Sequence, residues 1–259
     1  MLTTYPIFQP FSEVFAFSTQ RDGGVSEGAY ASFNITHYCG DRPECVHQNR
    51  ERLARRLGIE ESRIFLPHQV HNTRSLAIDT DFLALSREEQ TARMEGIDAL
   101  LTRERGICIG VSTADCAPLL FYDAATHTIA AVHAGWRGTV ACIAAKAVNE
   151  MARQFGCHPA DLRVAVGPCI SQAAFEVGEE VYEAFFDAGF PMDRIARREQ
   201  KWHIDLPAAN ALLLHECGVK PERIHLSELC TYSSPDRFFS ARRLGIQSGR
   251  VFNGIMLRT

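Results

Sequence analysis

A cysteine and a histidine lie at the ends of two neighbouring apolar runs. A thiol and an imidazole in proximity can bind a metal ion or act as a catalytic pair. Cys116 precedes the run PLLFYD (118–123), and His133 lies near the end of the run TIAAVHA (128–134). The turn between the runs predicts a β-hairpin. If paired residue numbers sum to 249 or 250, Cys116 lies opposite His133 or one residue away. Because both runs are apolar on both faces, the pattern leaves the register open.

A thiolate beside an imidazole is compatible with three interpretations. The pair could bind a zinc ion, it could be a nucleophile with its general base, or both side chains could be core residues. A catalytic zinc ion usually has three protein ligands and one open position. His68 and His71 in FLPHQVHNTRS are candidates for the third ligand. In an extended segment their side chains point to opposite faces, so we expect only one of them in the site.

The segment after His133 predicts an anion site. Gly135 and Gly138 allow a tight turn from a strand into a helix that begins near Thr139. The free N–H groups of the helix start, with Arg137 beside them, would favour an anion such as phosphate. Asp115 precedes Cys116, and a carboxylate at the mouth of an apolar hairpin must be exposed or hydrogen-bonded.

Helices are expected where apolar positions repeat with helical spacing between start and stop signals. The range 41–58 has Asp41 as a candidate N-cap and Gly58 as terminator; the other ranges are 139–156 and 205–218. Short β-branched or aromatic runs between them predict strands. These runs cover 13–19, 73–78, 98–102, 106–112, 118–123, 128–134, 162–167, 223–229 and 250–257.

Several strands follow one another without a helix between them, which favours mixed sheets and an α+β fold. The chain has 259 residues, and we find neither a repeat nor a linker. We therefore expect a single domain over 1–259.

Composition excludes several classes of partner. The formal net charge is −4 and no run of Lys and Arg reaches five residues, so we expect no nucleic-acid partner. No apolar stretch approaches the length of a membrane span, and the N-terminus lacks a basic signal region, so we expect a cytoplasmic protein. The sequence has 9 cysteines and no C-x-x-C pair, which argues against a disulfide framework.

Motifs over nearly the whole chain resemble the laccase-domain, or polyphenol-oxidase-like (YfiH-like), family. The motifs are RDGGVSEGAYASFNITHYCGD (21–41), QVH (69–71), DALLT (98–102), TADCAPLLFYD (113–123), AAVHAGWRGT (130–139), VGPCI (166–170), FEVG (175–178) and FFSARR (238–243). The TADC and HAGWRG elements are the most specific.

The resemblance implies a single-domain four-layer α/β/β/α sandwich. It also implies a zinc site whose ligands are His71, Cys116 and His133, which selects His71 over His68. The family's purine nucleoside enzymes imply phosphorolysis of adenosine, inosine, guanosine and methylthioadenosine, and hydrolytic deamination of adenosine. The expected partners are therefore purine nucleosides and phosphate, and we expect a monomer.

Further polar residues in motif positions could line the site. Asp115 and Arg137 are candidate catalytic residues, and Arg21, Asn34 and Arg243 are candidate substrate-binding residues; each could equally have a structural role. The sequence contains no His-x-His pair, which disfavours genuine laccase activity.

Two alternatives remain open. In one, Cys116 is the nucleophile and His133 the base of a cysteine hydrolase acting on an amide, and the family's link to peptidoglycan precursor editing would suit that activity. In the other, the protein is a metal-dependent scaffold without turnover.

Overall fold

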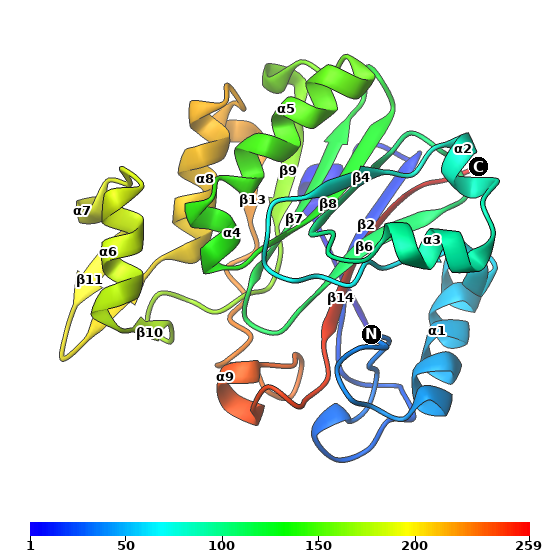
Figure 1. Cartoon of the computed structure of the whole chain (residues 1–259), viewed down its shortest axis with the longest axis horizontal. Coiled ribbons are helices and arrows are strands. Elements are labelled where there is room, and N and C mark those ends of the chain that lie inside the picture. Colours follow the sequence, from blue (N-terminus) through cyan, green and yellow to red (C-terminus); the bar gives the residue numbers. More distant parts are fainter.

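The computed structural model describes all residues from 1 to 259 and places two mixed sheets face to face (Figure 1). The larger sheet has the order β13 (Ile224–Leu226), β9 (Arg163–Val166), β7 (Ala117–Asp123), β8 (Thr128–Ala134), β5 (Ala99–Thr102), β4 (Ser75–Ala77). The second sheet has the order β1 (Leu2–Thr4), β2 (Val14–Thr19), β14 (Val251–Leu257), β6 (Cys108–Thr113), β3 (Ile64–Phe65).

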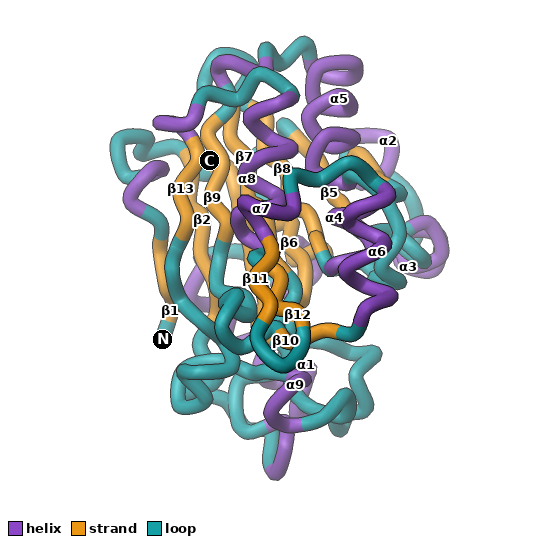
Figure 2. The backbone as a smooth tube through the Cα atoms, turned by 90° about the vertical axis from the view of Figure 1, so that its left-hand side faces the viewer, coloured by secondary structure: helices purple, strands orange, loops and turns teal.

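The helices are α1 (Pro43–Leu57), α2 (Thr80–Leu83), α3 (Arg87–Arg93), α4 (Trp136–Val140), α5 (Ile143–Phe155), α6 (Glu179–Asp187), α7 (Met192–Ile195), α8 (Leu206–Glu216) and α9 (Ala241–Leu244). Helices α5 and α8 pack on the outer face of the six-stranded sheet, and α1 packs on the outer face of the five-stranded sheet. A small sheet of β10 (Glu176–Val177), β12 (Trp202–Ile204) and β11 (Ala196–Arg198) forms an extension with α6 and α7 on one side of the molecule (Figures 1 and 2). No helix is both long and apolar enough to span a membrane.

Alternation along the strands separates three cores and produces four layers. Leu119 of β7 packs in one core with residues of α5 and α8, whereas its neighbour Leu120 packs in a second core against the five-stranded sheet. On the far side of that sheet, Phe252 of β14 packs with Leu53 of α1 in a third core. Successive side chains of a strand point to opposite faces, so strands apolar on both faces lie between two layers. The expected α/β/β/α sandwich is confirmed.

The expected mixture of strand directions is also confirmed. The pairs β13 with β9, β4 with β5, and β3 with β6 are parallel, and the remaining pairs are antiparallel. Each apolar run predicted as a strand forms one, while the short strands β1, β3, β10, β11 and β12 were not predicted. Their two or three residues are too few to show a period.

The register of the β7–β8 hairpin, which the sequence left open, differs from both of the pairings considered for it. Pro118, and not Cys116, lies opposite His133, and Cys116 lies just outside the strand. The turn has His127 with a φ of 50°, a left-handed conformation that residue type did not predict. Cys116 and His133 are therefore diagonal neighbours across the hairpin, which still brings their side chains within reach.

Two helix predictions are wrong in detail. The range 139–156 contains two helices, because Cys142 has a φ of 59° and this left-handed conformation separates α4 from α5. The first of these helices begins at Trp136 and not at Thr139. Asp41 is not the N-cap of α1; its carboxylate accepts hydrogen bonds from Ser26 and Asn34 instead.

The helix ends at Gly58 and Gly156 are confirmed, and both glycines adopt the left-handed conformation. The range 205–218 is also confirmed as a helix, with Asp205 as its N-cap.

Candidate metal centre

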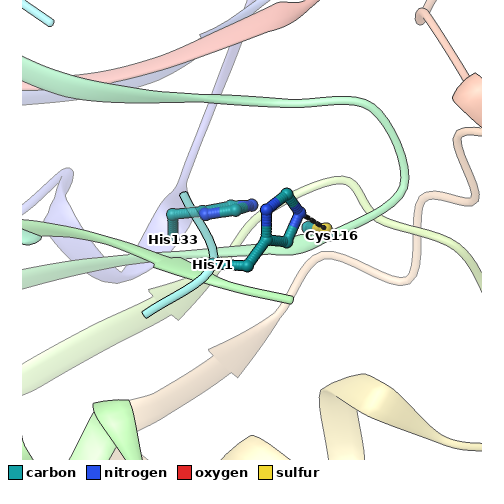
Figure 3. A group of neighbouring side chains, drawn as sticks. All are labelled: His71, Cys116 and His133. Atoms are coloured by element: carbon teal, nitrogen blue, oxygen red, sulfur yellow. Dashed lines mark hydrogen bonds between the residues drawn. The ribbon is translucent and has the colours of Figure 1, made fainter. Parts of the chain in front are cut away.

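His71, Cys116 and His133 converge at one end of the six-stranded sheet (Figure 3). His71 belongs to the loop before β4, Cys116 precedes β7, and His133 is near the end of β8. One ligand atom from each residue lies within 4.8 Å of the others. The Cys116 Sγ is 3.8 Å from the His71 Nε2. Two ligands of a tetrahedral zinc ion would be separated by about 3.6 Å, given typical Zn–N and Zn–S bond lengths. The donor set therefore fits a zinc ion, and the spacing of Cys116 and His71 is close to that of two zinc ligands.

The structure separates the two candidate histidines. His68 lies outside the cluster, where its Nδ1 is 2.6 Å from Glu95 Oε1 and its ring packs against Tyr38. His71 adopts a φ of 62°, a conformation that non-glycine residues seldom take, and its ring contacts that of His133 edge to face. The choice of His71 as the third member of the cluster therefore agrees with the geometry.

Asp98 organises the cluster and was not predicted as a site residue. Its carboxylate is fully buried at the start of β5 and lies 2.7 Å from the His133 Nδ1. This bond leaves the His133 Nε2 for the cluster. The same carboxylate accepts the backbone N–H groups of Val70, His71 and Asn72. One buried acid thus fixes the ring of His133 and the backbone of His71.

The electrostatics of the cluster favour a thiolate. Burial opposes ionisation of Cys116, but the imidazoles of His133 and His71 outweigh it and lower the pKa of the thiol to about 6. Burial acts against the charged form of His133 as well, yet Cys116 and Asp98 raise its pKa to about 9. Both shifts favour a thiolate beside an imidazolium, and a metal ion bound there would displace the proton on the side of His133 that faces it.

Gly135 leaves the space that the cluster occupies. A Cβ added to this residue would lie 2.9 Å from the His71 Cδ2 and 3.0 Å from the Cys116 Sγ. Both distances are shorter than ordinary carbon contacts. Glycine is required here because two side chains of the cluster pack directly on its Cα.

Asp115 is hydrogen-bonded and does not act as a ligand of the cluster. Its carboxylate accepts from the Thr231 hydroxyl at 2.6 Å and from the Arg242 backbone N–H at 2.7 Å. Its carbonyl accepts from the Ile170 N–H, and its φ is 92°. The residue ties the Cys116 turn to the loops after β9 and β13.

Arg137 is exposed on α4, directly after β8. Its guanidinium lies over the Trp136 ring at 4.2 Å and makes no intramolecular hydrogen bond or ion pair. The side chain is free to contact a ligand, and it does not brace the turn through backbone carbonyls. The short α4 differs from the long helix expected behind the turn.

The remaining three candidates make internal contacts. Arg21 donates to the carbonyls of Ala31 and Pro235. The buried Asn34 donates to Asp41, as described above, and accepts from the backbone of Arg250. Arg243 is exposed and donates to the Tyr232 carbonyl at 3.2 Å. The hydrogen bonds of Arg21 and Asn34 hold the segment after β2, and a role of these residues in substrate binding stays a prediction.

Comparison with known proteins identifies the family. Residues 15–258 match the family described as multi-copper polyphenol oxidoreductase laccase. The chain belongs to this family, as the motifs indicated.

Two named relatives and one solved structure are similar to this chain over nearly its full length. A purine nucleoside phosphorylase of Bacteroides thetaiotaomicron is 46% identical, with 98% of this chain and 95% of the relative covered. Adenosine deaminase RL5, from an unknown prokaryotic organism, is also 46% identical, with 93% of this chain and 92% of the relative covered. The crystal structure of the Bacillus licheniformis hypothetical protein YfiH superposes with a TM-score of 0.90 at 27% identity, covering 99% of this chain and 96% of that one. The expectation of an enzyme is confirmed.

Proposed function

We propose that the protein is a zinc-dependent purine nucleoside enzyme. It would phosphorolyse adenosine, inosine, guanosine and methylthioadenosine, and hydrolytically deaminate adenosine. The observation that carries the proposal is the group of His71, Cys116 and His133, oriented by Asp98, in a chain of which two close relatives are named for these activities.

His71, Cys116 and His133 would hold the zinc ion. When bound there, zinc would supply a Lewis acid and the means to activate water at neutral pH. The hydrogen bond to Asp98 would keep the proton of His133 on Nδ1, which would leave Nε2 as a neutral ligand atom for the ion. Adenosine and water would give inosine and ammonia.

In phosphorolysis, an oxygen of hydrogen phosphate would attack C1′ of the ribose. The bond from C1′ to N9 would break with its electron pair on the purine, which takes the proton that the phosphate gives up. Arg137 would hold the phosphate, since a planar guanidinium can contact two of its oxygens at once. Its exposed position after the end of β8, with no hydrogen bond or ion pair to the protein, supports this role.

The family description does not imply laccase chemistry in this chain. A single group of three His, Cys, Asp or Glu side chains is arranged to share an ion. A multicopper oxidase requires several copper centres with their own histidine ligands. We therefore assign no polyphenol oxidation to the protein.

Turnover of two substrates tests the proposal. Purified protein should convert inosine to hypoxanthine and ribose 1-phosphate only when phosphate is present, and adenosine to inosine without it. A chelator should abolish both reactions, and added zinc should restore them. Turnover that survives complete removal of metal would overturn the zinc assignment.

A second function is favoured by the low pKa of Cys116, about 6. Asp98, His133 and Cys116 could act as the acid, the base and the nucleophile of a cysteine hydrolase. Such an enzyme would act on an amide. The two functions differ in the reactivity of the thiol. A zinc-bound thiolate is shielded, so iodoacetamide should modify Cys116 only after metal removal. Rapid modification of fully metallated protein, with equal loss of activity, would favour the hydrolase.

A further inference from the structure

A cavity of about 320 Å³ opens at the same end of the six-stranded sheet as the metal ligands. It is lined by residues 166–172 after β9, by residues 226–230 after β13, and by Asp205 and Pro207 at the start of α8. None of the three metal ligands lines it. The volume is near the lower limit of small-molecule sites, which suits part of a nucleoside.

The cavity wall is hydrogen-bonded to the segment that carries Cys116. The Gly167 N–H donates to the Pro118 carbonyl, and the Ile170 N–H donates to the Asp115 carbonyl, both at 2.9 Å. In the sheet, β9 and β13 are the next two strands beyond β7. Neighbouring strands are about 4.8 Å apart, so the cavity lies on the order of 10 Å along the sheet edge from the ligands. A purine nucleoside can bridge that distance.

The lining suits a flat heterocycle with N–H groups. Val166, Ile170 and Leu226 provide apolar walls. The Ser227 hydroxyl and the Glu228 carboxylate make no intramolecular hydrogen bond or ion pair and can accept from a ligand. Glu228 also has a φ of 54°, a left-handed conformation that is uncommon for a non-glycine residue and recurs at ligand sites.

We propose that, in phosphorolysis, this cavity binds the purine base while C1′ of the ribose lies at the metal ligands. Deamination would use the reverse orientation, with C6 of adenine at the metal ligands. The proposal rests on the proposed phosphorolysis. An entering phosphate oxygen and the leaving base must occupy opposite sides of C1′. The sheet order β9-β7-β8 satisfies this requirement, because Arg137 follows β8 and the cavity follows β9, with Cys116 at the start of β7 between them.

The polar lining also accounts for a broad choice of bases. Hypoxanthine and guanine present a ring N–H, and adenine presents an exocyclic amino group. A carboxylate can accept from any of these donors, and a hydroxyl can rotate to donate or accept. The Glu228 carboxylate and the Ser227 hydroxyl can therefore hydrogen-bond to each of the three bases.

Two substitutions test the cavity without touching the metal ligands. Glu228→Ala removes an exposed hydrogen-bond acceptor, and Ser227→Phe fills the cavity. The matched control is Glu222→Ala, which removes an exposed carboxylate just before β13 and outside the cavity. Each cavity variant should raise KM for inosine at least tenfold, with a smaller change in kcat, because a contact kept from ground state to transition state acts on KM. Zinc content and the Glu222→Ala kinetics should equal wild type.

Calorimetry with hypoxanthine separates this proposal from the proposed function. Metal-free wild type should bind hypoxanthine, and both cavity variants should bind it at least tenfold more weakly. The cavity assignment would be overturned if wild type did not bind hypoxanthine. It would also be overturned if both cavity variants matched wild type in hypoxanthine affinity and in KM for inosine. Either result would count against the cavity even if the enzyme phosphorolyses inosine. Hypoxanthine binding that depends on the cavity, without any nucleoside turnover, would support the cavity and overturn the function.

Discussion

Asp98 joins two ligands of the proposed zinc site through one buried carboxylate. Asp98→Asn preserves the shape but removes the charge and one acceptor oxygen, which leaves at least one backbone N–H of residues 70–72 unpaired. We expect zinc affinity to fall about 10- to 100-fold and the free energy of unfolding to fall by roughly 1–3 kcal/mol. Competition titration with a zinc indicator and urea unfolding measure the two effects.

Asp123→Asn is the matched control for this substitution. Asp123 is equally buried, at the far end of β7, where it accepts from the Ala125 N–H. Its replacement should lower stability and leave zinc affinity unchanged. Equal zinc affinity in wild type and Asp98→Asn would show that Asp98 does not position the ligands.

Arg137 tests the proposed phosphate contact. Because its guanidinium overlies the Trp136 ring but makes no hydrogen bond or ion pair within the protein, Arg137→Ala should lower the free energy of unfolding by no more than about 1 kcal/mol. The apparent phosphate affinity in inosine phosphorolysis should fall about tenfold, the loss expected for a charge-assisted contact, while adenosine deamination falls less. Arg153→Ala, an exposed arginine on α5, serves as control. Identical phosphate dependence in wild type and Arg137→Ala would remove Arg137 from the site.

The sequence predicted the three residues that the fold brings together, but not the groups that hold them in place. Cys116 and His133 were visible because each flanks an apolar run, and the family resemblance selected His71. Asp98 is an ordinary acid before a strand, and only the folded chain shows its carboxylate between two histidines. Arg21 and Asn34 occupy motif positions, yet their hydrogen bonds are internal, since sequence cannot distinguish a polar group that binds substrate from one that holds a loop.

At the scale of elements, the turn from β8 into α4 shapes the site. Gly135→Ala would place a methyl group against His71 and Cys116, so these side chains must move. We expect about a tenfold loss of zinc affinity in a folded protein, because ligand placement within about 0.5 Å matters to a metal site. Gly138→Ala is the control, since its Cβ would meet only ordinary contacts. Unchanged zinc affinity in Gly135→Ala would contradict the assigned packing.

The contact between α1 and the segment before β3 predicts a dependence of stability on pH. Burial raises the pKa of Glu61, but the Arg50 guanidinium on α1 lowers it more, so the folded pKa is below the ordinary value. The stabilisation is present above the unfolded pKa and is lost as pH falls through the folded pKa.

Glu61→Gln should therefore lower the free energy of unfolding by roughly 0.5–1 kcal/mol at pH 7, with the difference from wild type disappearing below about pH 4. Urea unfolding across this pH range measures it, with Glu60→Gln as control. A difference that stays constant with pH would rule out the ionic contact as its cause.

Sequence patterns predicted the longer helices and strands but not the residues at which a helix is interrupted or a hairpin turns. Seven-residue apolar runs such as β7 and β8 are unmistakable, whereas the register of the pair depends on a turn with His127 in a left-handed conformation. Cys142 breaks the range 139–156 in the same way. A φ above zero at a residue other than glycine has no reliable signature in a single sequence.

At the scale of the whole molecule, the four layers place the site at one end of a rigid sheet. The proposed ligands come from the start of β7, from the end of β8, and from a loop that Asp98, directly before β5, holds by hydrogen bonds, so the strands keep them in position. The mixed sheets could be predicted from runs of strands without helices. The stacking of two sheets followed from the family resemblance, because apolar runs alone do not show which layer covers each face.

Metal analysis of protein purified without added metal tests the central claim most directly. We predict about one zinc ion per wild-type chain, as expected for a site with three protein ligands. Cys116→Ala should lose most of the zinc and the inosine phosphorolysis, with an unchanged circular dichroism spectrum. Stoichiometric zinc retained in Cys116→Ala, or copper in place of zinc in active wild type, would contradict the account.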